Sequence, residues 1–423
     1  MNKWYRWFFY CTLFGITLSL SGKSVLSNLD VHGFVSQGFL KSNYNNYLVN
    51  SVDGSFEFNE AALTTSIRVS DNLRIGMQLF ARDLGSEGNN NVVIDWAYGD
   101  YRIKDYLGIR IGKIKTPVGQ YNQGRDVDLL RTSILLPQGV YQESMRDFIL
   151  AFQGASAYGN LMLGILGDID YECYYGTLNV PETDSNFWKN IFTGLQDTLT
   201  RQLPEGSTAS VEKPDVTMKY VVGGAVKWNS PLQGLNLRGS YATGKLNIDA
   251  DIQAVVPLME IQPGLFLNNF MNIPLSAKID VQHFYTLSAE YSHYNLTATA
   301  EYLIENYDFT IEGKKLNYKG EGYYFLTDYR FSDYFAIGSY YSVHYPREND
   351  KTGDYPAKWG DPRCFAWQKD WCTTLRFDIN HNWLIKLEYH LINGCGQVRK
   401  FDNPSGEIKE NWMLYGLKTT YHF

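Results

Sequence analysis

Long apolar helices are missing from this sequence of 423 residues beyond its amino-terminal segment. A membrane-spanning helix needs about 20 consecutive apolar residues, so helical membrane spans are excluded for the rest of the chain. Runs of basic residues are missing too, and the formal net charge is −7, which argues against nucleic acid as a partner. Proline is scarce at 13 residues, whereas tyrosine contributes 32. Many aromatic residues with a mean hydropathy of only −0.30 fit a protein whose apolar surface is a thin outer band.

Cysteine is sparse as well, with five residues, of which Cys11 lies in the amino-terminal segment. The remaining Cys173, Cys364, Cys372 and Cys395 allow three pairings in an oxidising compartment. Cys364 and Cys372 lie in or beside one polar segment, and Cys395 ends a strand expected to neighbour the strand beginning near Cys372. We predict a disulfide among these three residues. No CxxC or Cys/His spacing typical of zinc ligands appears, so neither a metal site nor a cofactor is expected.

The amino-terminus has the layout of a secretory signal peptide. Lys3 and Arg6 precede an almost wholly apolar stretch at 7–20, and small polar residues follow up to Ser27. The apolar core is too short for a comfortable membrane span. We therefore expect residues 1–27 to be a cleaved signal peptide and residues 28–423 to form one exported domain.

The carboxy-terminal stretch 412–423 alternates between two kinds of residue. One row is mostly apolar and consists of Met413, Tyr415, Leu417, Thr419, Tyr421 and Phe423, while the other holds Gly416, Lys418, Thr420 and His422. Since side chains alternate across a strand, one face suits lipid and the other suits water. An amphipathic edge strand of a soluble sheet would show the same pattern. An apolar row ending on a terminal Phe also resembles the signal that hands bacterial outer-membrane barrels to their assembly machinery, with Tyr421 and Phe423 as its residues.

Alternating segments separated by turn residues recur along residues 28–423. They are expected to be strands at 29–41, 54–69, 73–84, 91–103, 107–115, 146–157, 160–175, 215–228, 234–246, 281–293, 296–310, 316–330, 334–346, 369–380, 383–396 and 409–423. Connections alternate between short ones, Tyr158-Gly159 among them, and long ones that include 116–145, 176–214, 247–280 and 347–368. This arrangement is typical of outer-membrane barrels. The predicted fold is all-β, a transmembrane antiparallel up-and-down β-barrel of 16 strands.

Charged residues fall mainly in the polar rows. A charge facing lipid at mid-depth costs about 2 to 4 kcal/mol, so these rows are expected to face the lumen. Lys113 departs from the pattern because it shares a row with Ile109 and Ile111; a bulge or a place at the outer rim would accommodate it.

A barrel of this size is wide enough for an aqueous lumen. The segment 116–138 carries Pro, Gly and paired charges and is too long for a tight hairpin. We expect it, as the third external loop, to fold inward and narrow the lumen. The residues expected to shape the constriction are Arg74, Arg82, Arg110, Arg125, Asp126, Asp128 and Arg131.

Several motifs resemble proteobacterial porins related to the phosphate-selective class. They are the run 107–138 with its Gly-Lys-Ile-Lys-Thr-Pro-Val-Gly and Arg-Asp-Val-Asp core, the segment 32–38 (HGFVSQG), the segment 79–85 (LFARDLG) and the segment 95–102 (DWAYGDYR). The resemblance implies a sixteen-stranded trimeric porin of the bacterial outer membrane with its third external loop folded inward. Its implied partners are outer-membrane lipid, the barrel-assembly machinery and further copies of the chain. The inward rows hold no dense ladder of Arg and Lys, so the resemblance indicates the class rather than the solute.

The function that these features favour is a water-filled channel for passive diffusion of small hydrophilic solutes and ions. A substrate-specific channel for phosphate, sugars or organic acids is an alternative. An outer-membrane hydrolase is less favoured, because no histidine of the chain sits in a recognisable catalytic motif. No catalytic residue and no enzymatic activity are therefore expected.

Overall fold

The computed structural model describes residues 28–85, 87–183, 185–262, 265–311, 313–403 and 407–423. The expected signal peptide lies outside the described residues. The strands are β1 (Leu29–Ser42), β2 (Phe58–Arg68), β3 (Leu73–Leu84), β4 (Val93–Lys104), β5 (Leu107–Lys115), β6 (Ala151–Met162), β7 (Asp168–Leu178), β8 (Thr208–Asn229), β9 (Leu235–Gln262), β10 (Leu265–His293), β11 (Leu296–Ile311), β12 (Lys314–Ser332), β13 (Phe335–Tyr345), β14 (Gln368–Asn380), β15 (Trp383–Gly394) and β16 (Asn411–His422). The helices are α3 (Arg146–Ile149), α4 (Asn186–Gln202) and α5 (Asp354–Lys358). Short 3₁₀ turns occupy η2 (Asn122–Gly124), η3 (Asp128–Leu130), η4 (Glu143–Met145), η5 (Gly164–Leu166), η6 (Arg363–Ala366) and η7 (Lys400–Asp402).

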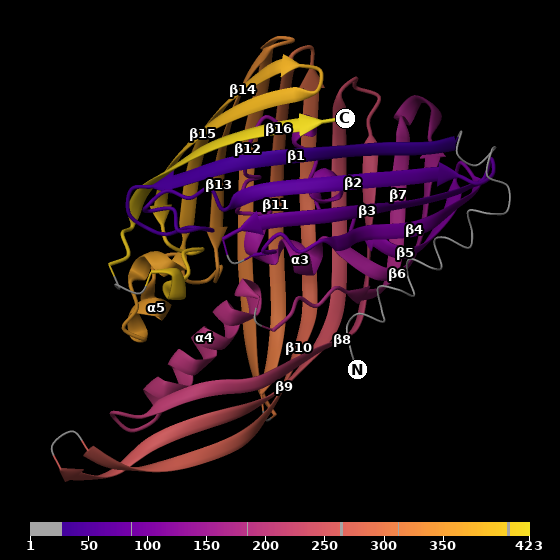
Figure 1. The fold of residues 1–423 in the computed structure, drawn as a ribbon. Helices are drawn as coiled ribbons and strands as arrows, with labels where there is room; N and C mark the ends of the chain where they lie inside the picture. Colours follow the sequence, from indigo (N-terminus) through magenta and orange to yellow (C-terminus); the bar gives the residue numbers. More distant parts are fainter. Residues whose placement is uncertain (1–27, 86, 184, 263–264, 312, 404–406) are drawn as a thin grey trace.

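These strands form one closed antiparallel barrel in which every strand pairs with its neighbours in the sequence (Figure 1). The predicted all-β barrel of sixteen strands is confirmed. Closure is made by β1 and β16, where Gly38 lies opposite Lys418 and Phe34 opposite His422. The backbones of Gly33 and Phe423 exchange two hydrogen bonds of 3.0 Å each. Phe423 therefore completes the β1–β16 ladder that closes the barrel.

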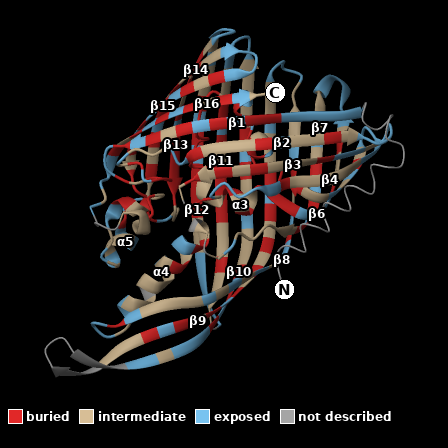
Figure 2. Cartoon of the chain, viewed as in Figure 1, coloured by how far each residue is buried: buried red, intermediate tan, exposed pale blue. Residues whose placement is uncertain are grey.

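The two faces of strands such as β3 and β16 differ in exposure, and alternating colours along strands are visible in Figure 2. On β16 the outward Tyr415, Leu417 and Tyr421 are exposed, whereas the inward Lys418 and Thr420 are buried. The apolar outer surface suits lipid, and the polar rows line the interior. Among the described residues, no helix is long and apolar enough to cross a membrane.

A bulge in β4 explains the position of Lys113. Ile94 pairs with Leu79, and Trp96 pairs with Gln78, the residue directly before Leu79. Asp95 therefore has no partner of its own on β3 and is the extra residue of the bulge. Lys113 keeps its place on β5 opposite Ala97 and donates a hydrogen bond of 2.6 Å from Nζ to the carbonyl of Ile94. The bulge thus supplies a carbonyl partner for an ammonium group that strand alternation would otherwise direct outward.

The connection between β6 and β7 differs from the prediction. β6 continues through Tyr158 and Gly159 to Met162, and the turn follows at residues 163–167. Gly164 and Gly167 have φ angles of 64° and 86°, which favour glycine because a Cβ is unfavourable there. The predicted turn at Tyr158-Gly159 is wrong, since its glycine lies within a strand.

The predicted long loop at 247–280 is also wrong. β9 and β10 have 28 and 29 residues, where crossing a membrane takes only about 9 to 11. At about 3.3 Å per residue, each strand is roughly 90 Å long, and both extend beyond the barrel together with β8 (Figure 1). We call the protruding parts of β8–β10 the arm.

An apolar row on the arm explains why it is ordered as a sheet. Ala250, Ile252 and Leu275 are buried and pack against Leu195 and Leu199 of α4. The apolar residues alternate with polar ones, which made this stretch look like a polar loop. α4 covers the apolar row, and the polar residues remain at the surface.

One disulfide joins two connections at the long-connection end of the barrel. Cys364, between β13 and β14, is bonded to Cys395, between β15 and β16, with their Cα atoms 5.0 Å apart. This confirms a disulfide within the predicted set of three cysteines. Cys372 is buried with a free thiol, and Cys173 is free and exposed.

Candidate functional site

Residues 116–150, between β5 and β6, lie across the barrel interior; we call them the interior segment. Its hydrogen bonds reach inward residues on strands far from β5: Gly119 to Thr286 of β10, Gln120 to Glu301 of β11, Gly139 to Ser342 of β13, Ile134 to Glu388 of β15 and Asp128 to Thr420 of β16. Contacts with so many parts of the wall require the segment to pass through the interior.

Carboxylates of the wall hold the backbone of the interior segment. Glu388 accepts hydrogen bonds from the backbone N–H groups of Ile134 at 2.9 Å and Leu135 at 3.0 Å. Glu301 accepts another from Gln120 at 2.9 Å. An irregular buried backbone needs partners for its N–H groups, and a bond to a charged group contributes about 1.5 to 3 kcal/mol. These glutamates therefore fix the segment to the wall.

Part of the barrel interior is a packed apolar core. Leu136, Val140 and Tyr141 of the interior segment are at most 4% exposed and pack with wall residues such as Tyr324 and Tyr340. An aqueous lumen of full barrel width is thus not what the structure has. The interior segment fills this part of the lumen because its apolar side chains pack against side chains of the wall.

A first ion-pair network lies beside β3. Arg82 contacts Glu143 at 3.2 Å and Asp147 at 3.1 Å, and Arg125 contacts Glu143 at 2.8 Å. Burial alone would raise the pKa of Glu143, but Arg125 and Arg82 outweigh it and hold that pKa below its usual value. Two predicted residues, Arg82 and Arg125, thus share one carboxylate.

A second network is centred on Asp126. Its carboxylate contacts Arg146 at 2.6 Å and Lys115 at 2.7 Å, and Arg146 also contacts Asp95 of the β4 bulge at 3.3 Å. Burial opposes ionisation of Asp126, yet the two cations place its pKa well below the ordinary value. The bulge is needed here because it turns Asp95 inward beside Trp96.

A third network lies against β15 and β16. Asp128 contacts Lys418 at 2.8 Å, Arg131 at 3.2 Å and Lys386 at 3.6 Å. Thr420 donates a further bond of 2.7 Å to Asp128. Burial would raise the pKa of Asp128, but Lys418 and Lys386 lower it strongly. The two wall lysines are almost fully buried. Both contact the Asp128 carboxylate of the interior segment, and Lys418 also contacts Glu60 of β2 at 2.6 Å.

The remaining predicted residues, Arg74 and Arg110, lie toward the short-turn end. Arg110 contacts Asp100 at 3.3 Å and Glu172 at 3.4 Å, and its guanidinium lies 3.9 Å from the ring centre of Tyr158. Arg74 donates a bond of 2.9 Å to Ser66. The structure therefore does not gather the seven predicted residues at one constriction. Five of them belong to the three networks, whereas Arg110 pairs with Asp100 and Glu172, and Arg74 bonds to Ser66.

Sequence reasoning missed five charged residues of the first two networks, namely Asp95, Lys115, Glu143, Arg146 and Asp147. Glu143, Arg146 and Asp147 end the interior segment, where Arg146 begins α3 rather than the strand predicted from residue 146. One feature of the sequence could have revealed them. Arg146 and Asp147 are adjacent residues of opposite charge directly after a long connection. The inward position of Asp95 could not be predicted from the sequence, because the alternation of residues in this strand does not reveal the bulge.

A cavity of about 860 Å³ opens beside these networks at the long-connection end. Its lining includes Arg82, Asp95, Arg146 and Asp147 from the first two networks, and Glu182 from the connection between β7 and β8. Opposite charges line its walls close together. Such a space suits small polar solutes and ions better than apolar ones.

Comparison with solved structures shows a likeness of fold. The outer membrane channel DcaP of Acinetobacter baumannii has 10% sequence identity and a TM-score of 0.53, over 93% of this chain and 97% of that one. Salmonella typhi OmpF in complex with daunomycin has 12% identity and a TM-score of 0.53, over 94% and 98% of the two chains. An anion-selective porin from Comamonas acidovorans has 11% identity and a TM-score of 0.51, over 93% and 99%.

No protein-family model matches the sequence, and no curated protein matches it. The likeness to the three solved structures is therefore one of fold: this chain has a porin-type β-barrel. It supports the porin barrel without singling out the phosphate-selective class that the sequence motifs resemble.

Proposed function

We propose that this chain is an outer-membrane porin that passes small hydrophilic solutes and ions by passive diffusion. The observation that carries the proposal is a closed barrel with an apolar outer surface whose interior holds a charged cavity beside a fixed interior segment. The apolar exterior supports a location of the barrel in lipid. Charged inward residues keep its passage wet, and the interior segment limits its width.

The route we propose follows the wall of β3–β7. On the opposite side, the interior segment packs tightly against β11–β16. Along β4 and β5, by contrast, the inward Tyr98, Asp100 and Arg110 are only half-buried, and the cavity lies toward the other end of this wall. Solutes passing here meet cations and carboxylates in close pairs. We therefore expect weak ion selectivity and no preference for apolar molecules.

Residues 1–27 and the last strand, β16, support a proposal for location and assembly. We infer that residues 1–27 are removed on export and that the barrel-assembly machinery recognises the last strand. Tyr421 and Phe423 support this, because their side chains are exposed on the outer side at the short-turn end. We further propose a homotrimer in the outer membrane, as the porin motifs imply.

Planar-bilayer recording of the purified full-length protein tests the proposal. We expect stepwise conductance that rises in proportion to salt concentration, with closures in groups of three. Conductance that saturates and is blocked by phosphate, a sugar or an organic acid would favour a substrate-specific channel instead. Absence of any conductance from correctly folded barrels would refute the channel function.

A further inference from the structure

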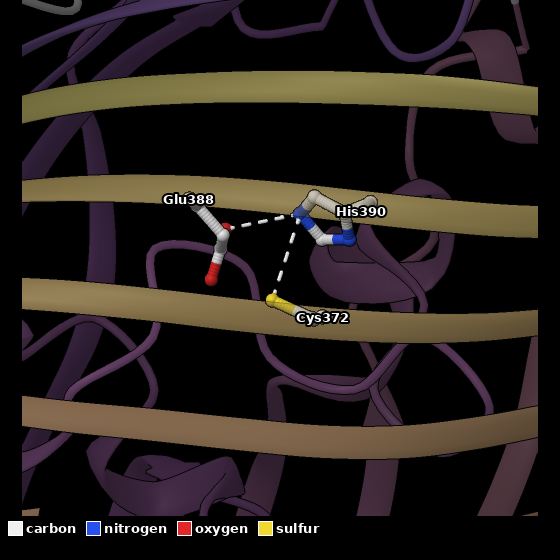
Figure 3. Close-up of side chains that lie close together, drawn as sticks. All are labelled: Cys372, Glu388 and His390. Atoms are coloured by element: carbon white, nitrogen blue, oxygen red, sulfur yellow. Dashed lines mark hydrogen bonds and ion pairs between the residues drawn. The ribbon is translucent and has the colours of Figure 1, made fainter.

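Three side chains of metal-ligand type converge inside the barrel wall. Figure 3 shows Cys372 of β14 pointing toward Glu388 and His390 of β15. Cys372 lies directly opposite His390 in the register, and Glu388 is two residues before His390 on the same face. All three are at most 4% exposed. The antiparallel pairing therefore assembles the cluster from a Glu-x-His pair and one cysteine of the neighbouring strand.

The donor atoms have nearly the spacing of a tetrahedral metal site. His390 Nε2 lies 3.3 Å from a carboxylate oxygen of Glu388 and 3.9 Å from the sulfur of Cys372, and all three donor atoms lie within 4.8 Å of one another. Zinc bonds of about 2.0 Å to nitrogen or oxygen and 2.3 Å to sulfur place ligand atoms roughly 3.3 to 3.6 Å apart. A shift of a few tenths of an ångström brings the sulfur into this range of Nε2, and the sulfur and the Glu388 oxygen, which lie within 4.8 Å of each other, approach as the ion binds.

Neighbouring groups orient two of these ligands. The Asp370 carboxylate lies 3.0 and 3.1 Å from His390 Nδ1. With the Nδ1 proton donated to Asp370, His390 Nε2 carries the free lone pair that a metal requires. Glu388 is held by Thr374, whose hydroxyl donates a bond of 2.9 Å, and by the N–H groups of Ile134 and Leu135.

We propose that Cys372, Glu388 and His390 bind one divalent ion of the zinc class. A thiolate, an imidazole and a carboxylate together suit Zn²⁺, which accepts all three donor types. Binding replaces the thiol proton of Cys372 by a sulfur–metal bond and displaces the proton held between His390 Nε2 and Glu388, so two protons are released. Three protein ligands leave a fourth position for water.

The ion would also tie the wall to the interior segment. Glu388 is at once a proposed ligand and the acceptor for the backbone of Ile134 and Leu135. Metal binding would therefore stabilise the docked interior segment. This role is independent of whether the barrel conducts, because it concerns only the folded wall and the segment bound to it.

The first experiment uses the wild-type, full-length protein in detergent. After removal of bound metal with a chelator, the protein is titrated with Zn²⁺ and, separately, with Co²⁺. We expect one ion per folded chain, and a sulfur-to-cobalt charge-transfer band that Zn²⁺ abolishes by displacement. Folded protein that binds no ion, or binds Co²⁺ without a thiolate band, overturns the proposal.

Variants assign the ligands. Cys372→Ser and His390→Gln should each remove stoichiometric binding, and Cys372→Ser should also remove the charge-transfer band. Asp370→Asn, which changes a positioning residue, should weaken binding by roughly 10- to 100-fold. Cys173→Ser is the matched control, because Cys173 is the other free cysteine of the described chain and is exposed. Equal Co²⁺ binding by Cys372→Ser and Cys173→Ser, both folded, would also overturn the assignment.

Discussion

The charged residues of the three networks are stable inside this barrel because each has an ionic partner. Arg146 and its partners Asp95 and Asp126 are all about 3% exposed or less at their side chains. Transfer of an unpaired charge to such a place carries a desolvation penalty of several kcal/mol. The partners are supplied by different elements: the β4 bulge, the interior segment and α3.

Removing Arg146 should therefore destabilise the protein strongly. Arg146→Ala leaves Asp95 and Asp126 buried with only Lys115 as a cation, and we expect a loss of about 3 to 5 kcal/mol in the free energy of unfolding. Urea unfolding in lipid or detergent measures it. Arg102→Ala is the control, because Arg102 pairs with Asp105 at the surface with side chains 58% and 94% exposed, and exposed pairs contribute only about 0 to 1 kcal/mol. Equal losses in the two variants would contradict the burial argument.

Acid should loosen the docking of the interior segment. Burial would raise the pKa of Asp147, but Arg82 and Arg146 lower it to about 2. Because the unfolded value is about 3.9, the ionised form stabilises the native state above pH 4 or so, and this contribution is lost as pH falls toward about 2. We expect the free energy of unfolding to decline over this window. The decline should be smaller in Asp147→Asn, and an identical pH profile for that variant would contradict the assignment.

At the scale of elements, α4 is fixed to the arm mainly by aromatic side chains. Trp188 is 1% exposed, with its ring centre 5.8 Å from that of Phe192 and 6.4 Å from that of Phe148 at the end of the interior segment. The same cluster includes Leu246 and Ile279 of the arm strands. One tryptophan thus links α4, the arm and the interior segment.

We expect Trp188→Ala to release α4 from the arm while the barrel stays intact. Truncation of a buried aromatic residue costs about 3 to 5 kcal/mol, and here the loss falls on a peripheral element. Limited trypsin digestion should then cleave at Lys189 in the variant much faster than in the wild type. Asn190→Ala, at an exposed position of the same helix, should behave like the wild type. Unchanged cleavage of Trp188→Ala would show that other contacts hold α4.

The last strand should matter for assembly more than for conduction. Deleting Phe423 removes its two backbone hydrogen bonds with Gly33 and its outward aromatic ring, whereas Lys418 and Thr420 keep their contacts with Asp128. We expect lower amounts in the outer membrane but normal single-channel conductance of inserted molecules. Phe423→Trp, which retains an aromatic end, is the control. Normal outer-membrane levels of the deletion would count against this role.

At the scale of the whole molecule, the interior segment should set the electrostatics of the channel. Neutralising Arg125 and Arg131 together to Gln leaves the Glu143 and Asp128 carboxylates with fewer cations. We expect the reversal potential in a KCl gradient to shift toward cation selectivity, with a changed conductance. Arg102→Gln, at an exposed site in the short-turn region, should change neither. If the double variant leaves both quantities unchanged, the interior segment is not the filter.

The sequence by itself determined the barrel. All sixteen strands could be located because alternation is a local property: Leu417 and Lys418 face opposite sides whatever the rest of the chain does. The closure of β16 on β1 followed from the even strand count and the placement of both chain ends. Even the charged interior was predictable, because charges are excluded from the lipid face.

Only the tertiary structure decided which residues meet across the interior. Asp128 contacts Lys418 across 290 positions of sequence, and no local pattern encodes such a contact. The bulge at Asp95, the protruding arm and the cluster of Cys372, Glu388 and His390 likewise depend on register and on packing between distant elements. Alternation fixes the side of the wall on which a residue lies, whereas its partners depend on how the interior segment crosses the barrel.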